Sequence, residues 1–160
     1  MAKDISNLQD RALLVFAYLT AGRSGEIAGT VKKIGCQYMD SGGRNILLIT
    51  MPNLKNRVRK QKQLPIPLDR EGELVAMLQE YLDLLSDENI LFPFCSRTAR
   101  EKMKSIVGFD IRYMRHIRAT HLVTMYDFNE QLLVRFMGWT DSRPAKNYME
   151  LRWVDFLSKM

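Results

Sequence analysis

Three arginines stand at intervals of three residues in the segment RYMRHIRATHL, at Arg112, Arg115 and Arg118, together with His116 and His121. A long cation loses side-chain entropy when it is ordered and hydration when it is buried, so this cluster needs either water or an anion around it. On a helix, a step of three residues leaves side chains about 60° out of line, so Arg112 and Arg115 can converge on one anion. An isolated R-x-x-R is more often a solvated basic face, so the rest of the chain must decide.

The elements that would position this cluster are mostly helical. Apolar residues at helical spacing predict helices at 6–22, 24–33, 70–85, 96–107, 112–126, 129–138 and 142–150. Ser6 or Asn7, Ser24 and Asp69 are the expected N-caps of the first three helices. Alternating or continuous apolar segments predict strands at 34–40, 44–52 and 63–68, with a turn at the Ser-Gly-Gly of 41–43 between the first two and a basic loop between the last two. In the helix at 112–126, helical spacing predicts a stripe that faces the core, made of Ala119, Leu122, Val123 and Tyr126. The predicted fold class is therefore α+β, with many helices and a small three-stranded antiparallel sheet.

Composition favours one soluble domain. The chain has 160 residues with 46% hydrophobic content, which is enough for one core. Its longest apolar runs are too short to cross a bilayer and its first residues lack the layout of a signal peptide, so a cytoplasmic location is expected. Cys36 and Cys95 match no metal-binding spacing, and both are expected to be reduced and packed.

The charge is uneven. There are 24 Lys and Arg residues against 18 Asp and Glu residues, a formal net charge of +6. Cations gather at 55–62, in KNRVRKQK, whereas acidic residues gather at 68–89. A patchy basic surplus of this kind is consistent with a surface that meets DNA.

The arginine segment resembles the second conserved box of the tyrosine recombinases, the phage integrase family, which is usually written H-x-x-R-H-x-x-A-T-H. Arg115, His116, Ala119, Thr120 and His121 match this pattern. The position where the family usually has its first histidine is occupied by arginine.

Two further segments resemble the other boxes of the same family. TAGRSGE is similar to the first box and supplies Arg23 and Glu26, while MGWTDSRPAKNYMEL is similar to the last. In that last box Gly138 and Trp139 precede Tyr148, and Trp139 stands nine positions before it. Three boxes in order, separated by the sheet and its basic hairpin, cover nearly the whole chain.

The resemblance implies the catalytic fold of this family over residues 1–160, without the N-terminal DNA-clamping domain that its members generally add. The apolar tail at 150–160 is expected either to pack on its own domain or to contact a neighbouring subunit, as in many recombinases of this type, and the resemblance implies a dimer or tetramer assembling on double-stranded DNA. The segments RHIRATHL and MGWTD are similar to those of archaeal plasmid or virus integrases.

The implied activity is site-specific recombination by cutting and rejoining DNA without metal or cofactor. Arg23 and Arg115 would neutralise phosphate charge, because their planar forks hold phosphate oxygens and keep their charge. Tyr148 would attack and form a 3′-phosphotyrosyl link, which conserves bond energy for rejoining. Trp139 would donate its indole N–H to a phosphate oxygen or pack beside it.

In this family, a lysine on the turn between the second and third strands protonates the leaving 5′-oxygen. The candidates are Lys55, Lys60 and Lys62, of which Lys55 is favoured because it directly follows the second strand. Other cations are expected to contact the DNA backbone, namely Arg57, Arg59, Lys60, Lys62 and Arg118.

Arg112 departs from the family pattern, since it stands where histidine is usual. An arginine can donate to a phosphate oxygen but cannot act as a base near neutral pH. His116 and His121 remain candidates for accepting the tyrosine proton, but for both the favoured interpretation is a histidine that packs beside the core. Glu26 and His116 are expected to support the site. The alternatives are a DNA-binding module that has lost turnover and a type IB topoisomerase that relaxes supercoils.

Overall fold

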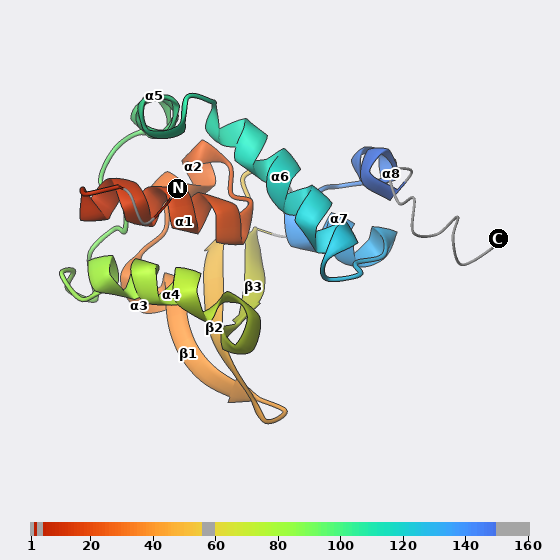
Figure 1. Cartoon of the computed structure of the whole chain (residues 1–160), viewed down its shortest axis with the longest axis horizontal. Helices are drawn as coiled ribbons and strands as arrows, with labels where there is room; N and C mark the ends of the chain where they lie inside the picture. Colours follow the sequence, from red (N-terminus) through yellow and green to blue (C-terminus); the bar gives the residue numbers. More distant parts are fainter. Residues whose placement is uncertain (1, 3–4, 56–59, 150–160) are drawn as a thin grey trace.

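A computed structural model describes residues 2, 5–55 and 60–149 of the chain (Figure 1). Its elements in chain order are α1 (Leu8–Thr20), α2 (Ser24–Ala28), α3 (Lys32–Gly35), β1 (Cys36–Ser41), β2 (Arg44–Pro52), β3 (Gln61–Pro67), α4 (Leu68–Leu82), α5 (Ser96–Val107), α6 (Ile111–Thr124), α7 (Glu130–Met137) and α8 (Arg143–Met149). This arrangement confirms the predicted α+β class, in which helices surround one antiparallel sheet with strand order β1-β2-β3.

The sheet follows the alternation of its sequence. A two-residue turn at Gly42 and Gly43, both with positive φ, joins β1 to β2, and Ser41 pairs with Arg44 across it. In β2 the buried residues are Leu47, Ile49 and Met51, and in β3 they are Lys62, Leu64 and Ile66. The period of two therefore places one lysine in phase with the apolar core residues.

Helix α1 forms the centre of the molecule and packs against α4, α5 and α6 (Figure 1). Between Ala12 and Thr20 every residue except Tyr18 is buried, so this helix is apolar on nearly all sides. The Asn7 side chain caps it by accepting a hydrogen bond from the amide of Asp10 at 3.0 Å. Burial of α1 fixes the position of the turn that follows it, where Arg23 stands.

Helices α5 and α6, from the second half of the chain, also pack against α1. Helix α6 packs against α1, α5, α7 and α8, and Ala119, Leu122 and Val123 on it are buried as predicted. The Asp110 side chain caps α6 by accepting from the Arg112 amide at 2.9 Å. Within the described residues, no helix is both long and apolar enough to cross a membrane.

Several local predictions were wrong. The segment 24–33, predicted as one helix, forms two short helices. The chain leaves α2 at Gly29, and the Thr30 hydroxyl donates a hydrogen bond to the Glu26 carbonyl at 3.0 Å. Arg23 rather than Ser24 is the N-cap of α2. Asp69 lies inside the first turn of α4, where it binds Arg44 instead of capping. Cys36 is half-buried, but Cys95 is exposed at the start of α5.

Candidate active site

The turn between α1 and α2 brings the first predicted site residue into the interior. Ala21 adopts the left-handed conformation with φ of 46°, which costs a non-glycine residue roughly 1–2 kcal/mol. The Thr20 hydroxyl supports the turn, since it donates to the Phe16 carbonyl at 2.7 Å and accepts from the Gly22 amide at 3.1 Å. The strained turn leaves the Ala21 carbonyl free to accept a hydrogen bond from another element.

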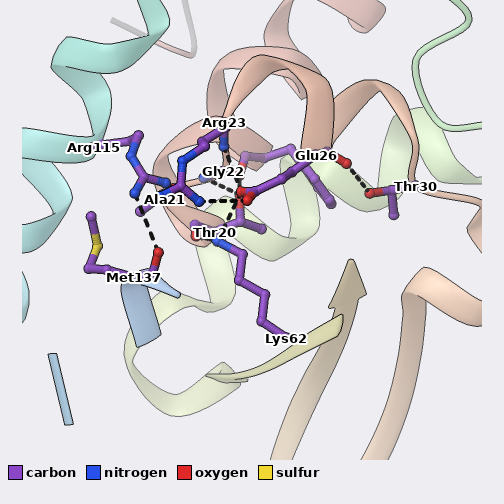
Figure 2. Close-up of polar contacts among 10 residues, drawn as sticks. Thr20, Ala21, Gly22, Arg23, Glu26, Thr30, Lys62, Arg115 and Met137 are labelled. Atoms are coloured by element: carbon purple, nitrogen blue, oxygen red, sulfur yellow. Dashed lines mark hydrogen bonds and ion pairs between the residues drawn. The ribbon is translucent and has the colours of Figure 1, made fainter. Parts of the chain in front are cut away.

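Glu26 fixes the position of Arg23 through two hydrogen bonds (Figure 2). The Arg23 guanidinium donates to Oε1 of Glu26 at 2.7 Å, and the Arg23 backbone amide donates to Oε2 at 2.9 Å. Glu26 is fully buried, and burial raises the pKa of its carboxyl; the charge of Lys62 and the bonds from Arg23 outweigh this and leave the pKa below its usual value. Glu26 therefore stays ionised and holds the Arg23 side chain in one orientation.

Lys62 enters the same cluster from β3. Its Nζ lies 3.5 Å from Oε2 of Glu26 and donates to the Thr20 carbonyl at 3.3 Å. Its side chain is only 4% exposed. Burial lowers the pKa of Lys62 to about 8, and the charges of Arg115 and Arg23 add to this while Glu26 opposes it. A phosphate outside the protein cannot readily reach an ammonium group in this position, so the geometry favours a supporting role over the predicted backbone contact.

Arg115 connects this cluster to the last box (Figure 2). Its guanidinium donates to the Ala21 carbonyl and, at 3.3 Å, to the Met137 carbonyl at the end of α7. Burial lowers the pKa of Arg115 to about 10, and the charge of Arg23 contributes, whereas Glu26 and Tyr148 oppose the shift. Arg115 thus stays charged at neutral pH and lies within electrostatic range of both Arg23 and Tyr148.

Tyr148 and Trp139 lie together at the edge of this region. Their rings stack with centroids 6.0 Å apart and planes 19° apart. The Tyr148 hydroxyl lies 2.5 Å from Nδ1 of His116. Burial raises the pKa of Tyr148, with the nearby charge of Arg115 acting in the opposite direction. The structure therefore brings together residues from all three sequence boxes.

Two arginines of the opening cluster lie elsewhere. Arg112 is 72% exposed and its Nε donates to Asp110 at 3.3 Å, at the first turn of α6. Arg118 is 2% exposed and donates to Glu71 at 2.5 Å, so its guanidinium is not available to DNA in this conformation. Arg118 stands seven residues after Ile111 and four before Leu122, both buried, and that spacing could have indicated a core position.

The basic turn between β2 and β3 is described only in part. Lys55 and Lys60 are exposed at its two sides, whereas Arg57 and Arg59 lie outside the described residues. The turn closes at its base, where the Asn53 amide donates to the Lys60 carbonyl at 2.7 Å. Lys55 and Lys60 are therefore positioned to meet a ligand in solvent.

An open cavity of about 470 Å³ adjoins the cluster and is lined by Asn53, Gln61, Lys62, Gln63, Val134, Arg135, Gly138 and Trp139. Asn53 is a residue that the sequence did not single out. It is buried, its Oδ1 has no hydrogen-bond partner among the residues that the structure describes, and its side-chain amide lies against Gly138. In the sequence, only the position of Asn53 directly before the basic turn could have indicated a role at the site. Among the described residues, no group of three or more His, Cys, Asp or Glu side chains could hold a metal ion.

Solved structures share this fold. The chain superposes on the XerA recombinase with a TM-score of 0.66 at 16% identity, covering 96% of this chain and 56% of the other. A XerH site-specific recombinase bound to its difH substrate gives 0.59 at 16% identity, covering 98% and 48%. The Tn1549 transposon integrase in complex with transposon right end DNA gives 0.55 at 14% identity, covering 88% and 54%.

These similarities concern the fold. The chain has the fold of the tyrosine recombinase catalytic domain and spans about half the length of the structures it matches. No family model matches the sequence, and no curated protein is similar enough in sequence to match it.

Proposed function

We propose that this chain is the catalytic part of a site-specific DNA recombinase that cuts and rejoins DNA through a phosphotyrosyl intermediate. The observation that carries the proposal is the position of Arg115, which lies beside Arg23 (Figure 2) and whose charge lowers the pKa of Tyr148 against the effect of burial. Two fixed cations beside a phenol match the needs of phosphodiester cleavage, in which phosphate charge must be neutralised and a nucleophile aligned. The similar folds solved with DNA substrates support DNA as the partner.

In the proposed reaction, Arg23 and Arg115 hold the non-bridging oxygens of the scissile phosphate. Arg23 retains exposed surface and is oriented by Glu26, while Arg115 is fixed by two backbone carbonyls. The Tyr148 oxygen attacks phosphorus, the bond to the 5′-oxygen breaks, and that oxygen takes a proton. Lys55 is the proposed donor, because it is exposed on the turn beside the cavity, whereas Lys62 is buried. Trp139 packs on the tyrosine ring and keeps it at the cluster.

The test is covalent capture of DNA. A pool of nicked duplexes with a randomised centre lets the short cleaved strand diffuse away, so a covalent intermediate accumulates. We expect a protease-sensitive protein–DNA band on a denaturing gel that Tyr148→Phe abolishes. Tyr113→Phe is the matched control, since Tyr113 is an exposed tyrosine on α6 and should leave the band unchanged.

Other outcomes separate the alternatives. Bound DNA without any covalent band would indicate a binding module without turnover, and a band that persists in Tyr148→Phe would assign the nucleophile elsewhere. Exchange of strands between two captured sites would distinguish a recombinase from a topoisomerase. Assembly into dimers or tetramers on DNA is part of the proposal, and the predicted contact segment at 150–160 lies outside the described residues.

A further inference from the structure

His116 contacts Tyr148, and this contact has no part in the proposed neutralisation of phosphate charge by Arg23 and Arg115. Nδ1 of His116 lies 2.5 Å from the Tyr148 hydroxyl, and the two rings stack with centroids 6.0 Å apart and planes 30° apart. The imidazole also contacts the Tyr113 ring, with centroids 6.4 Å apart. The histidine is therefore packed against two aromatic rings, with one nitrogen within hydrogen-bonding distance of the phenol.

The phenol needs a proton acceptor. A tyrosine hydroxyl is largely protonated at neutral pH, and burial raises the pKa of Tyr148 further, while the charge of Arg115 offsets only part of that effect. Attack on phosphorus requires the proton to leave the oxygen. A base within hydrogen-bonding distance can accelerate such a step by roughly 10²- to 10⁴-fold.

Among the described residues, no other neighbouring group suits this task. The charged residues described on the helices packed around the pair, and on the loop before α8, are Arg112, Arg115, Arg118, Glu130, Arg135, Asp141, Arg143 and Lys146. The cations have no free lone pair at neutral pH. Glu130 stands at the far end of α7 from Trp139, and Asp141 accepts three hydrogen bonds from Arg143 at 3.0, 3.1 and 3.0 Å. The indole of Trp139 only donates.

The arrangement follows from adjacent positions on one helix. Arg115 and His116 are neighbours on α6, so their side chains leave the helix about 100° apart. Arg115 reaches the Ala21 and Met137 carbonyls, and His116 faces α8. One turn of helix thus supplies both a cation for the phosphate and an acceptor for the nucleophile.

We propose that His116 is the general base of the cleavage step, a role that rests on the proposed function of the chain. As the Tyr148 oxygen bonds to phosphorus and the bond to the 5′-oxygen breaks, the phenolic proton passes to Nδ1. The neutral imidazole must then carry its own hydrogen on Nε2. In rejoining, the 5′-hydroxyl attacks phosphorus as its proton returns to the neutral amine of Lys55, the bond between phosphorus and the Tyr148 oxygen breaks, and the imidazolium returns its proton to the departing phenolate.

The experiment is single-turnover cleavage of the captured duplex as a function of pH. A general base accepts the phenolic proton only in its neutral form, so the native rate should rise with pH and then level off. His116→Asn keeps an acceptor near the position of Nδ1 but cannot take up a proton. Its rate should fall roughly 10²- to 10⁴-fold and should lose the rise assigned to imidazole.

The matched control is His121→Asn. His121 lies on the same helix and its Nδ1 is 2.8 Å from the Tyr18 hydroxyl, so it makes the same kind of bond away from Tyr148. This variant should keep the native pH profile. Replacing Tyr148 with 3-fluorotyrosine, a more acidic phenol, should recover part of the rate in His116→Asn, which a merely structural role would not produce.

The outcomes are distinguishable from failure of the proposed function. If native protein forms no Tyr148-dependent covalent complex, the recombinase proposal itself fails. If it does, and His116→Asn folds and cleaves at the native rate with the native pH profile, only the role of His116 is overturned. Should the substitution unfold the domain, the native profile decides, because a native rate that does not rise with pH contradicts a base that must be neutral to accept the proton.

Discussion

Arg118 contributes to the core rather than to the proposed DNA surface. Its guanidinium donates to Glu71 at 2.5 Å and lies 4.7 Å, 5.3 Å and 5.8 Å from the ring centroids of Tyr18, Tyr126 and Phe136. The Tyr126 hydroxyl donates to the same Glu71 oxygen. A buried pair of this kind stabilises little compared with an apolar pair, but either charge alone is very unfavourable.

Removing one partner should therefore be costly. We expect Arg118→Leu to lower the free energy of unfolding by about 3 kcal/mol or more, because Glu71 is left as a buried charge without its cation. Arg97→Ala breaks the pair with Glu101 on α5, where Arg97 is 86% exposed, so it should change the free energy of unfolding far less than Arg118→Leu does. Denaturant unfolding measures both. The double variant Arg118→Leu with Glu71→Leu should regain most of the loss, and additive losses would contradict this account.

At the scale of elements, the end of α7 is fitted to the base of the β2–β3 turn. Gly138 ends the helix with φ of 67°, and a Cβ there would lie 2.9 Å from Nδ2 of Asn53. The next residue, Trp139, donates its amide to the Val134 carbonyl at 3.1 Å and carries the ring that stacks on Tyr148. The contact between Asn53 and Gly138 thus links the proposed lysine turn to the proposed nucleophile.

Gly138→Ala should perturb both stability and cleavage. Gly108→Ala is the matched control, because Gly108 ends α5 with φ of 81° and has open space where the Cβ would stand. An alanine in the left-handed conformation costs roughly 1–2 kcal/mol in both variants, so the difference between their free energies of unfolding reports the contact with Asn53. We expect Gly138→Ala to be less stable than Gly108→Ala by about 1 kcal/mol and to form less covalent complex. Equal thermal unfolding and equal capture of DNA would show that the contact has no effect.

Across the whole molecule, whose net charge is +6, some of the cationic side chains are exposed and others are buried. Lys55 and Lys60 are exposed on the β2–β3 turn, whereas Lys62 and Arg118 are almost fully buried and paired with Glu26 and Glu71. Only the exposed group can release counterions from DNA phosphates.

The salt dependence of DNA binding should separate the two groups. Each phosphate contact contributes about 0.9 to the slope of log affinity against log salt. We expect Lys55→Ala and Lys60→Ala each to reduce the slope by about that amount, and Lys62→Met, checked for folding, to leave it unchanged. Fluorescence anisotropy at several salt concentrations measures the slope. A reduced slope in a folded Lys62→Met protein would show that this buried lysine reaches the DNA.

Local patterns in the sequence determined much of the architecture. Helical spacing placed the buried stripe of Ala119, Leu122 and Val123 correctly, and the paired glycines marked the β1–β2 turn. The N-cap at Asn7 was also among the predicted caps. These features depend on residues close together in the chain, so propensity and periodicity suffice to predict them.

The tertiary structure alone decided which charges are buried and which residues meet. The three arginines of the opening cluster have the same side chain and equal spacing, yet their surroundings differ. Arg112 is exposed and pairs with Asp110, and Arg118 is buried and pairs with Glu71. Arg115 is held by backbone carbonyls at the ends of α1 and α7. The contact between His116 and Tyr148 joins residues 32 positions apart. Each outcome depends on the packing of distant elements, because burial and available partners set the free energy of a charge far more than its own neighbours in sequence do.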